Sequence, residues 1–378
     1  MKRLDLVECR NKLDQIDKEI VRLFEERMTV CNDVAQYKIE TGKAVYDAGR
    51  EKQKIVAVRE LAGSEFNKQA VQEIFSQLMT ISRRFQYGCL AACQKASSTG
   101  FTEMDSLKKE NVRVVFQGVE GAYSHAAVKM FFGDGVNAYH VPEFEDTMKE
   151  VEGGRADYGV LPIENSTAGF VISNYDLLAK YSNYIVGEVY VPVDHVLLGL
   201  WEASLSDIKT IYSHPQGLMQ CTKFLNSNKD WKQIGVPNTA VAAKKIMEEK
   251  DVTQAAVASR AAGEQYGLKE LARGISDEKG NTTRFIILAK DPVYETKASK
   301  ISLTFEVPHV SGSLYNILGN FIFNGVNMNM IESRPIPGKP FEYRFFVDIE
   351  GNLSDASIKN ALTGIQAEAS FMKILGNY

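Results

Sequence analysis

The chain has 378 residues, of which 44% are hydrophobic, and is long enough for two or three domains that each bury a core. The formal net charge of -4, with acidic and basic residues interspersed, excludes a polyanion such as nucleic acid as the main partner. The first residues contain no apolar signal-peptide core, and no run approaches a membrane span. Five scattered cysteines without metal-ligand spacing favour a reducing cytoplasm: Cys9, Cys31, Cys89, Cys93 and Cys221.

The first quarter of the chain is predicted to be all-helical. Residues 4–40 contain no glycine or proline, and apolar residues recur at helical spacing there and again over 50–61 and 68–93. The polar, aperiodic stretch that follows is typical of a linker. We therefore expect a helical domain over residues 1–95 and a linker over residues 96–111.

The rest of the chain carries two patterns of strands and helices. Over residues 112–290, short strand-like runs such as "VRVVF" and "FIIL" alternate with helical stretches, which indicates parallel α/β layers. Over residues 300–378 the elements follow a β-α-β-β-α-β order, which predicts a ferredoxin-like α+β domain. The six elements are expected at 301–307, 314–323, 327–333, 344–349, 354–363 and 369–375.

Three cations interrupt the apolar seam of the first helix. Arg27 and Lys38 lie in the middle of its apolar arc, and Arg10 lies toward the rim. Burying unpaired cations is costly, so the seam predicts an anionic ligand or partner. Arg27 and Lys38 are about 16 Å apart along the axis and can converge on one small molecule, whereas Arg10 is about 25 Å from Arg27. The helix would be about 55 Å long, too long for one small domain to cover, so we expect an antiparallel dimer in which Arg10 serves the partner's site.

The helical segment contains "RNKLDQIDKEIVRLFEER", Lys38, "YDAGRE" and "SRRFQ". In these motifs it resembles the all-helical chorismate mutases of the type fused to prephenate dehydratase, over about residues 4–86. The resemblance implies a substrate site in which all eight positions match: Arg10, Arg27, Lys38, Asp47, Arg50, Glu51, Ser82 and Gln86. Chorismate rearranges to prephenate in a pericyclic step, which needs a folded dicarboxylate and donors at the ether oxygen rather than an acid or a nucleophile.

The same resemblance implies roles for these side chains. The arginines would clamp the two carboxylates of the substrate. Lys38 and Gln86 would donate hydrogen bonds to the ether oxygen. Glu51 would orient the substrate hydroxyl, although its place on a helix face equally allows a salt bridge to Lys52 or Lys54.

Polar, loop-rich motifs follow the strand-like runs of the middle segment: "VFQGVEGAYSHAAV", "GVLPIENSTAGFV", "YSHPQGLMQC" and "NTTRF". Sheets of α/β proteins place ligand sites at such strand ends. With these motifs, residues 112–288 resemble prephenate dehydratase, which folds as two lobes hinged around a cleft, like a periplasmic binding protein. The resemblance implies one lobe over residues 112–190 and 275–289 and a second lobe over residues 192–274.

The motif "NTTRF" precedes a buried strand expected at residues 285–289. Thr283 matches the family's essential threonine, a neutral donor to the leaving hydroxyl, and Arg284 is suited to fixing a carboxylate or organising the strand end. Because side chains alternate along a strand, Thr282 is expected to point away from the side that Thr283 faces. Alternatively, the residues of this motif only cap a turn and have a structural role. His214 is a candidate acid, although a histidine beside proline in a loop more often has a structural role. The other matching cleft positions are Glu164, Asn165, Ser213 and Gln220.

The last segment contains "SGSLYNILGNFIFNGVNMNMIESRP" and "FVDIEG", and in these it resembles an ACT regulatory domain. The resemblance implies that a loop at a helix N-terminus binds an amino acid and that the next strand forms a wall. The matching positions are Gly312, Ser313, Leu314, Glu332, Ser333, Arg334 and Pro335. Ser313 and Tyr315 depart from the commoner Gly-Ala-Leu-Val motif, and an ACT fold kept for dimerisation alone is the alternative.

Together the resemblances predict a cytoplasmic, bifunctional chorismate mutase and prephenate dehydratase that phenylalanine inhibits. No cofactor, metal, nucleic acid or membrane is expected, and the partners are chorismate, prephenate, phenylalanine and further copies of the chain. Two rivals remain. A mutase fused to a tyrosine-branch dehydrogenase would need a Gly-rich phosphate loop, and the chain has no G-x-G-x-x-G. A non-enzymatic amino-acid sensor would use the same cleft only to bind.

Overall fold

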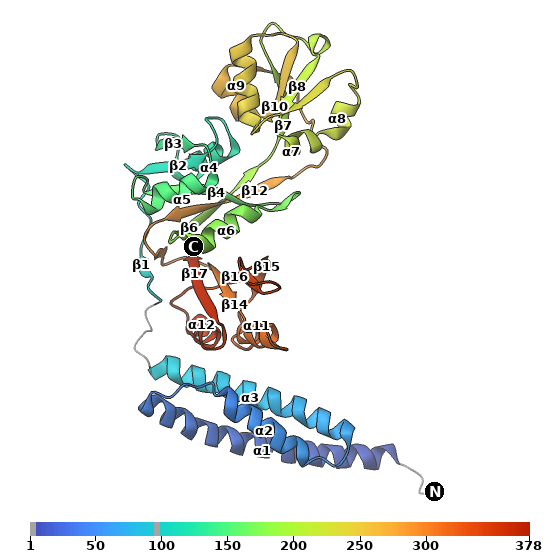
Figure 1. The fold of residues 1–378 in the computed structure, drawn as a ribbon, viewed down its shortest axis with the longest axis vertical. Helices are drawn as coiled ribbons and strands as arrows, with labels where there is room; N and C mark the ends of the chain where they lie inside the picture. The colour runs from blue at the N-terminus through green and yellow to red at the C-terminus, as the bar shows by residue number, and fades with distance from the viewer. Residues whose placement is uncertain (1–4, 94–98) are drawn as a thin grey trace. The chain divides into compact units, whose positions relative to one another are not determined.

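The computed structural model describes residues 5–93 and 99–378 (Figure 1). The chain forms two compact units: Met1–Thr99 with Thr304–Lys373, and Gly100–Leu303 with Ile374–Tyr378. Each unit therefore combines segments that lie far apart in the sequence. Residues 1–4 and 94–95 of the predicted helical domain, and residues 96–98 of the predicted linker, lie outside the described residues.

Three helices form the first part of the first unit: α1 (Leu6–Thr41), α2 (Ala48–Glu60) and α3 (Glu65–Cys93). The Asp5 carboxylate caps α1 by accepting from the Val7 amide at 2.8 Å, and Gly42 ends it with a φ of 66°. Both α1 and α2 pack against α3. The three predicted helices are confirmed, with their ends shifted by a few residues. No helix in the described part of the chain has the length and apolar character needed to cross a membrane.

The apolar seam of α1 is uncovered in a single copy of the chain. Cys31 and Ala35 are buried, whereas Leu13 keeps 57% and Ile20 keeps 58% of its surface exposed. An apolar stripe of this length normally faces another element. The seam thus offers a surface that a second helix can cover.

The C-terminal part of the chain has the predicted β-α-β-β-α-β order. Its elements are β14 (Lys300–Glu306), α11 (Ser313–Phe323), β15 (Met328–Pro335), β16 (Tyr343–Glu350), α12 (Ala356–Glu368) and β17 (Phe371–Asn377). The strands are adjacent in the order β15-β16-β14-β17, so β15 is an edge strand. Phe305, Phe321 and Phe346 are buried in its core, and α12 packs against both α11 and α3.

The first lobe of the second unit is a sheet with strands in the order β6-β12-β4-β2-β3. Their bounds are β2 (Arg113–Gln117), β3 (Asn137–Val141), β4 (Tyr158–Asn165), β6 (Tyr184–Pro192) and β12 (Thr282–Ala289). Helices α4 (Tyr123–Phe132) and α5 (Phe144–Glu152) pack on it. The prediction of parallel layers is wrong for β12, which runs antiparallel to both β4 and β6. The reason is that β12 returns from the second lobe and inserts between two outgoing strands. It also begins at Thr282, three residues before the predicted start.

The second lobe is a sheet in the order β11-β7-β10-β8-β9. Its strands are β7 (His195–Gly199), β8 (Thr210–Ser213), β9 (Lys232–Gly235), β10 (Gln254–Ser259) and β11 (Lys269–Ala272). Its helices are α7 (Pro215–Met219), α8 (Thr222–Asn226), α9 (Thr239–Glu249) and α10 (Arg260–Tyr266). All of these strands lie within the residues predicted for the second lobe, and their sheet has hydrophobic clusters on it. Ile275, which was predicted to belong to the first lobe, is buried in one of these clusters.

Part of the predicted linker is structured. Strand β1 (Thr102–Met104) pairs in parallel with β13 (Val293–Glu295), and Leu107 is buried in the core of the first lobe. Strand β1 has only three residues, and Leu107 is a single core side chain after it. A pattern this short cannot be recognised from the periodicity of apolar residues. These residues belong to the second unit.

Candidate active sites in the two units

The helical site gathers around one buried face of α3. Ser82 and Gln86, one turn apart on this face, are 4% and 7% exposed. Arg27 of α1 reaches Ser82: its Nη1 donates to the Ser82 hydroxyl and, at 3.4 Å, to the Leu78 carbonyl. The Gln86 side-chain oxygen is buried and has no hydrogen-bond partner among the described residues. A buried polar atom of this kind is a place where a ligand would bind.

Lys38 closes the site from the end of α1. Its Nζ donates to the Val45 carbonyl at 2.6 Å, and burial lowers the pKa of Lys38 against the opposing pull of Asp47 and Glu51. Asp47 caps α2 by accepting from the Arg50 amide at 2.9 Å. These bonds hold the loop between α1 and α2 against the Lys38 ammonium.

Glu51 pairs with a residue that the sequence analysis did not single out. Its Oε2 lies 2.5 Å from Nη1 of Arg83, whose side chain is 6% exposed. The partner is therefore Arg83 rather than the predicted alternatives, Lys52 or Lys54. Arg83 stands inside the quoted motif "SRRFQ", but nothing local distinguishes it from the neighbouring Arg84.

Two predicted members are not drawn into this cluster. Arg50 is exposed in the first turn of α2, and Arg10 is exposed on α1. Arg10 precedes Arg27 by 17 positions of one continuous helix, which is about 25 Å. The structure thus brings together six of the eight predicted residues within one chain: Arg27, Lys38, Asp47, Glu51, Ser82 and Gln86.

In the second unit, Asn165 and Thr283 meet at the ends of β4 and β12. Asn165 Nδ2 donates to Thr283 Oγ1 at 2.9 Å and to Asn281 Oδ1 at 2.7 Å. Asn165 Oδ1 accepts from the backbone amides of Thr167 and Ala168 at 3.1 and 2.9 Å. The amide is therefore fixed at both ends. Because Thr283 Oγ1 accepts from Asn165, its own hydrogen is available to donate elsewhere.

Thr283 and Asn165 line a cavity of about 430 Å³ between the two lobes. The first lobe contributes Ala122, Tyr123 and Ser124 at the N-terminus of α4, and the second contributes Asn238 and Thr239 at the N-terminus of α9. No side chain caps the start of α4. At the start of α9 the Asn238 side chain accepts from the Val241 amide at 2.8 Å, so uncapped amides are found at α4, and the positive ends of both helix dipoles favour an anion in the cavity.

The sequence analysis did not single out a hydrogen-bonded chain of three side chains that line the cavity: Tyr123, His195 and Gln220. His195, 3% exposed, lies 3.1 Å from the Tyr123 hydroxyl through Nδ1 and 3.0 Å from Gln220 Oε1 through Nε2. Burial lowers the pKa of His195, against the bond to Gln220, and burial raises the pKa of Tyr123. His195 is the first residue of β7, separated by two residues from the end of β6 at Pro192, and no local pattern marks it as a site residue.

His214 lines the same cavity and caps α7. Its Nδ1 accepts from the Gln216 amide at 3.2 Å, and burial lowers the pKa of His214. Gln220, one of the predicted cleft residues, also lines it. A second hollow of about 790 Å³ shares Asn165, His214 and Gln220 with the first, so the cleft continues toward residues 276–278.

Three predicted cleft residues do not line either hollow. Ser213 is fully buried and donates to the Val257 carbonyl at 2.6 Å. Glu164 and Arg284 lie one position away from Asn165 and Thr283, so strand alternation turns them to the other face. There Arg284 bonds Glu188 at 2.7 Å and lies 3.8 Å from Glu164.

Arg284 is bonded at the end of the strand and does not line the cavity. It is 7% exposed and, besides Glu188, donates from Nη2 to the Tyr378 hydroxyl at 2.7 Å. Thr282, as expected, does not line the cavity, and its hydroxyl donates to the Gly280 carbonyl at 3.2 Å.

The predicted effector residues divide into two groups. Gly312, Ser313 and Leu314 line a hollow of about 590 Å³ at the N-terminus of α11, where Gly312 has a φ of 82°. Glu332, Ser333 and Arg334 lie on the edge strand β15 and are not among the residues that line it. Within one chain, the predicted effector residues of the loop and those of the strand therefore do not line the same hollow.

Comparisons with known proteins agree with this division of sites. The chorismate mutase type II family model matches residues 9–87, and the prephenate dehydratase family model matches residues 114–293. The first match spans most of α1, all of α2 and most of α3, and the second spans both lobes.

One full-length relative carries both activities in its name. The chain is 33% identical over 380 residues to a bifunctional chorismate mutase/prephenate dehydratase of Enterobacter agglomerans, and the match covers 99% of this chain and 95% of the relative.

Two solved structures resemble the part of the chain beyond the helices. A prephenate dehydratase of Arthrobacter aurescens in complex with L-Phe is 30% identical, with a TM-score of 0.65 and coverage of 71% of this chain and 90% of that one. GqqA, described as a novel type of quorum quenching acylase, is 32% identical, with a TM-score of 0.65 and coverage of 70% and 97%.

These matches favour neither the tyrosine-branch fusion nor the non-enzymatic sensor. The two matched regions follow each other in the order of the two sites, and the Enterobacter relative aligns across nearly the whole of both chains. The chain belongs to the family of bifunctional chorismate mutase/prephenate dehydratases.

Proposed function

We propose that this chain rearranges chorismate to prephenate at the helical site and then converts prephenate to phenylpyruvate in the cleft. The observation that carries the second half is the bond of 2.9 Å from Asn165 to Thr283, which aims a threonine hydroxyl into a cavity with two helix N-termini. The observations that support the first half are the bond from Arg27 of α1 to Ser82 on the buried face of α3 that also carries Gln86, and the half-buried Lys38 beside Asp47 and Glu51.

The helical site works by positioning. Arg27 binds a substrate carboxylate, which holds the dicarboxylate in the folded conformer that the pericyclic step requires. Lys38 and the Gln86 amide donate to the ether oxygen as negative charge develops on it. Glu51 accepts from the substrate hydroxyl through Oε1, because Arg83 occupies Oε2.

The second copy of the chain completes this site. Arg10 lies too far along α1 to reach the Arg27 cluster of its own chain, and the exposed seam around Leu13 and Ile20 is a surface for another α1. An antiparallel pair of α1 helices covers both seams and brings Arg10 of one copy to the site of the other. A dimer is therefore the smallest active form of the mutase.

In the cleft, prephenate loses its ring carboxylate as carbon dioxide. The electron pair of the broken bond enters the ring, which becomes aromatic, and the ring hydroxyl leaves as hydroxide that ends as water with a proton from solvent. Thr283 donates a hydrogen bond to that leaving oxygen. The starts of α4 and α9 hold the carboxylate of the pyruvyl side chain.

Phenylalanine binds the C-terminal part, which is an ACT regulatory domain in this proposal. Gly312 presents its backbone amide at the start of α11 to the amino-acid carboxylate, whereas the Ser313 amide donates to the Val310 carbonyl at 3.3 Å. Because β15 is an edge strand, a second copy can bring its own Glu332–Arg334 segment to this hollow. The complex of the Arthrobacter aurescens protein with L-Phe supports this choice of effector.

Purified full-length protein incubated with chorismate tests the two activities together. We expect chorismate to disappear and phenylpyruvate to form, with prephenate as a transient. Unchanged chorismate would contradict the mutase assignment. Prephenate that accumulates without phenylpyruvate would contradict the dehydratase assignment.

The effector site has its own test in two glycines of positive φ, Gly312 at 82° and Gly338 at 80°. Gly312→Val should abolish inhibition of dehydration by phenylalanine, because the side chain strains the loop and fills the hollow. Gly338→Val imposes similar backbone strain outside the hollow and should leave inhibition in place. Equal effects of the two variants would argue against the site.

A further inference from the structure

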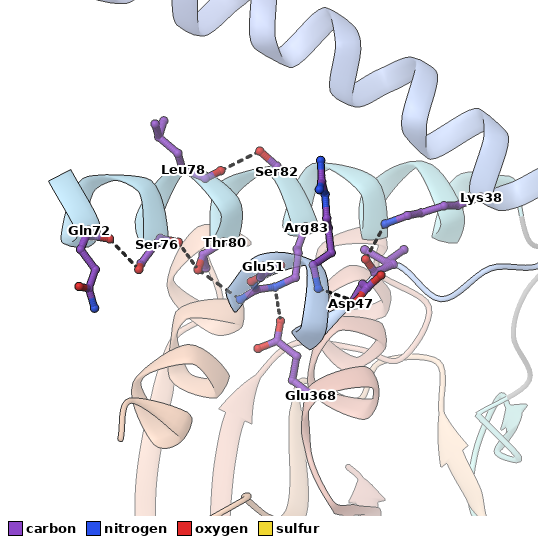
Figure 2. A network of polar contacts seen from close by, with 12 residues as sticks. Lys38, Asp47, Glu51, Gln72, Ser76, Leu78, Thr80, Ser82, Arg83 and Glu368 are labelled. Carbon is purple, nitrogen blue, oxygen red and sulfur yellow. Dashed lines mark hydrogen bonds and ion pairs between the residues drawn. The ribbon is translucent and has the colours of Figure 1, made fainter. Parts of the chain in front are cut away.

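The Arg83 guanidinium uses its three nitrogens on three different side chains (Figure 2). Nη1 lies 2.5 Å from Glu51 Oε2, Nε lies 3.1 Å from Glu368 Oε1, and Nη2 donates to Thr80 Oγ1 at 3.2 Å. The Arg83 side chain is 6% and the Glu368 side chain 9% exposed. A planar guanidinium that is bonded on three sides and shielded from water is held in one orientation.

This cluster joins two parts of the chain that are far apart in sequence. Arg83 belongs to α3 in the helical part, and Glu368 is the last residue of α12 in the C-terminal part. The contact between these parts is broader than one ion pair, because α3 packs against α12 and the Arg84 guanidinium lies 3.4 Å from the ring centroid of Phe323 on α11. All of these residues belong to the first compact unit.

The charges in the cluster depend on one another. Burial raises the pKa of Glu368, while Arg83 and Arg84 oppose that shift and the Glu51 carboxylate reinforces it. Two carboxylates thus share Arg83 as their buried cation. Removing one member of such a group leaves another charge uncompensated, and the remaining side chains then move to find new partners.

Glu51 is the member of the cluster that faces the helical site. Arg83 holds its Oε2, which fixes the direction of Oε1. Glu368 in turn fixes Nε of Arg83, so that Nη1 points at Glu51 rather than at solvent. Glu51 must accept a hydrogen bond from one substrate hydroxyl. The reaction is faster when such a carboxylate is already held in the right direction before the substrate binds.

We propose that Arg83 is a positioning residue for Glu51 in the mutase reaction, and that Glu368 of the C-terminal part completes it. The C-terminal part is then a structural component of the mutase site as well as a candidate effector domain. This inference rests on the proposed function, because it assumes that Glu51 contacts chorismate.

The test is a double-variant cycle on the full-length protein. Glu368→Ala removes the second carboxylate, Glu368→Gln keeps an acceptor of the same size, and Glu51→Gln removes the charge that Arg83 holds. Gln366→Ala changes an exposed residue of the same helix and serves as the matched control. Mutase kcat and KM for chorismate, dehydratase kcat/KM for prephenate, and far-UV circular dichroism are measured for each variant.

We expect Glu368→Ala to lower mutase kcat/KM by about tenfold, Glu368→Gln to recover part of this loss, and the control to behave as the parent. Dehydratase kcat/KM and circular dichroism should be unchanged. In the Glu51→Gln variant, adding Glu368→Ala should lower mutase kcat/KM only slightly further, because Glu368 acts through Glu51.

Two results would overturn the inference while leaving the proposed function intact. The first is normal mutase activity in Glu368→Ala. The second is a loss in Glu368→Ala that adds fully to the loss in Glu51→Gln. A parent protein that leaves chorismate unchanged, or full mutase activity in Glu51→Gln, would instead overturn the proposed role of Glu51 and the inference with it.

Discussion

Asn165 determines what Thr283 can do, because it donates to the threonine oxygen and leaves the hydroxyl hydrogen for the cavity. The neighbouring Glu164 and Arg284 have the same polar character but lie on the opposite face of the sheet. At the scale of one residue, the alternation of side chains between the two faces of the sheet determines which of two adjacent polar residues lines the cavity.

Replacement of Thr283 should separate the two activities. Thr283→Ala removes the donor, so prephenate formed from chorismate should accumulate while phenylpyruvate formation falls by about a hundredfold or more. Thr283→Ser keeps a hydroxyl and should retain most of the dehydration rate. Product analysis with chorismate and with prephenate as substrates checks both variants, and near-normal dehydration by Thr283→Ala would remove this residue from the reaction.

Replacement of Gln86 should change the pH dependence of the mutase. An amide donates at every pH, whereas a carboxyl group donates only when it is protonated. Gln86→Glu should therefore be active at acid pH and lose activity as the pH rises. Gln69→Glu places the same charge at an exposed position of α3 and should leave the profile as it is. A profile of Gln86→Glu that matches the parent would show that Gln86 does not face the ether oxygen.

At the scale of helices and strands, the periodicity of apolar residues predicted those elements that depend on interactions between residues close in sequence. The long glycine-free run gave α1, and the alternation of apolar runs gave the two sheets, because each pattern has to bury one face. The insertion of β12 between β4 and β6 has no such signature, since an antiparallel neighbour and a parallel neighbour bury the same apolar run. The pairing of β1 with β13 joins segments about 190 positions apart and was likewise missed.

The site residues follow the same division. Resemblance of motifs located Asn165, Thr283 and Gln86, because these stand in contiguous stretches with a recognisable order of polar groups. His195 and Arg83 become visible only when β7 meets α4 and when α3 meets α12. A contact that spans 285 positions, such as that between Arg83 and Glu368, leaves no trace in a local pattern.

The buried histidine of β7 predicts a pH dependence of stability. Burial lowers the pKa of His195 from its ordinary value of 6.5, so the unfolded chain takes up a proton at a higher pH than the folded chain. The stabilising contribution is therefore complete above about pH 6.5 and is lost as the pH falls toward the lowered pKa. His125 and His214 are shifted in the same direction by burial and add to this loss.

Denaturant unfolding measured at several pH values by tryptophan fluorescence checks this expectation. The two tryptophans of the chain, Trp201 and Trp231, both lie in the second lobe and report its unfolding. The free energy of unfolding should decrease below about pH 6.5, and His195→Gln should make that decrease shallower. An equally steep decrease in the variant would mean that His195 is not the group responsible.

At the scale of the whole molecule, the proposed pairing of two α1 seams predicts that the mutase needs two copies of the chain. Arg10→Ala and Arg27→Ala homodimers should each be nearly inactive as mutases. If Arg10 acts on the partner's site, a mixed dimer has both substitutions in one site, and its other site is intact. Random remixing makes half of the dimers mixed, so roughly a quarter of all sites should recover, by two-fold symmetry.

Refolding equal amounts of the two variants together and assaying chorismate consumption measures this recovery. Each variant refolded alone is the control and should stay inactive. Absence of recovery in a mixture whose subunits have demonstrably exchanged would show that Arg10 acts within its own chain.

The course of the chain between its two units has a consequence for proteolysis. The backbone passes from one unit to the other three times, after Thr99, after Leu303 and after Lys373. A single nick beside Gly100 cuts the backbone between the helical part and the rest of the chain, yet the Arg83–Glu368 bond and the stacking of Arg84 on Phe323 still attach the helical part to the C-terminal part. Nicked protein should therefore migrate as two fragments in denaturing gels while eluting as one species from a sizing column. Because the Arg83–Glu368 pair is buried, salt screens it only weakly, so raising the salt concentration should release little of the smaller fragment.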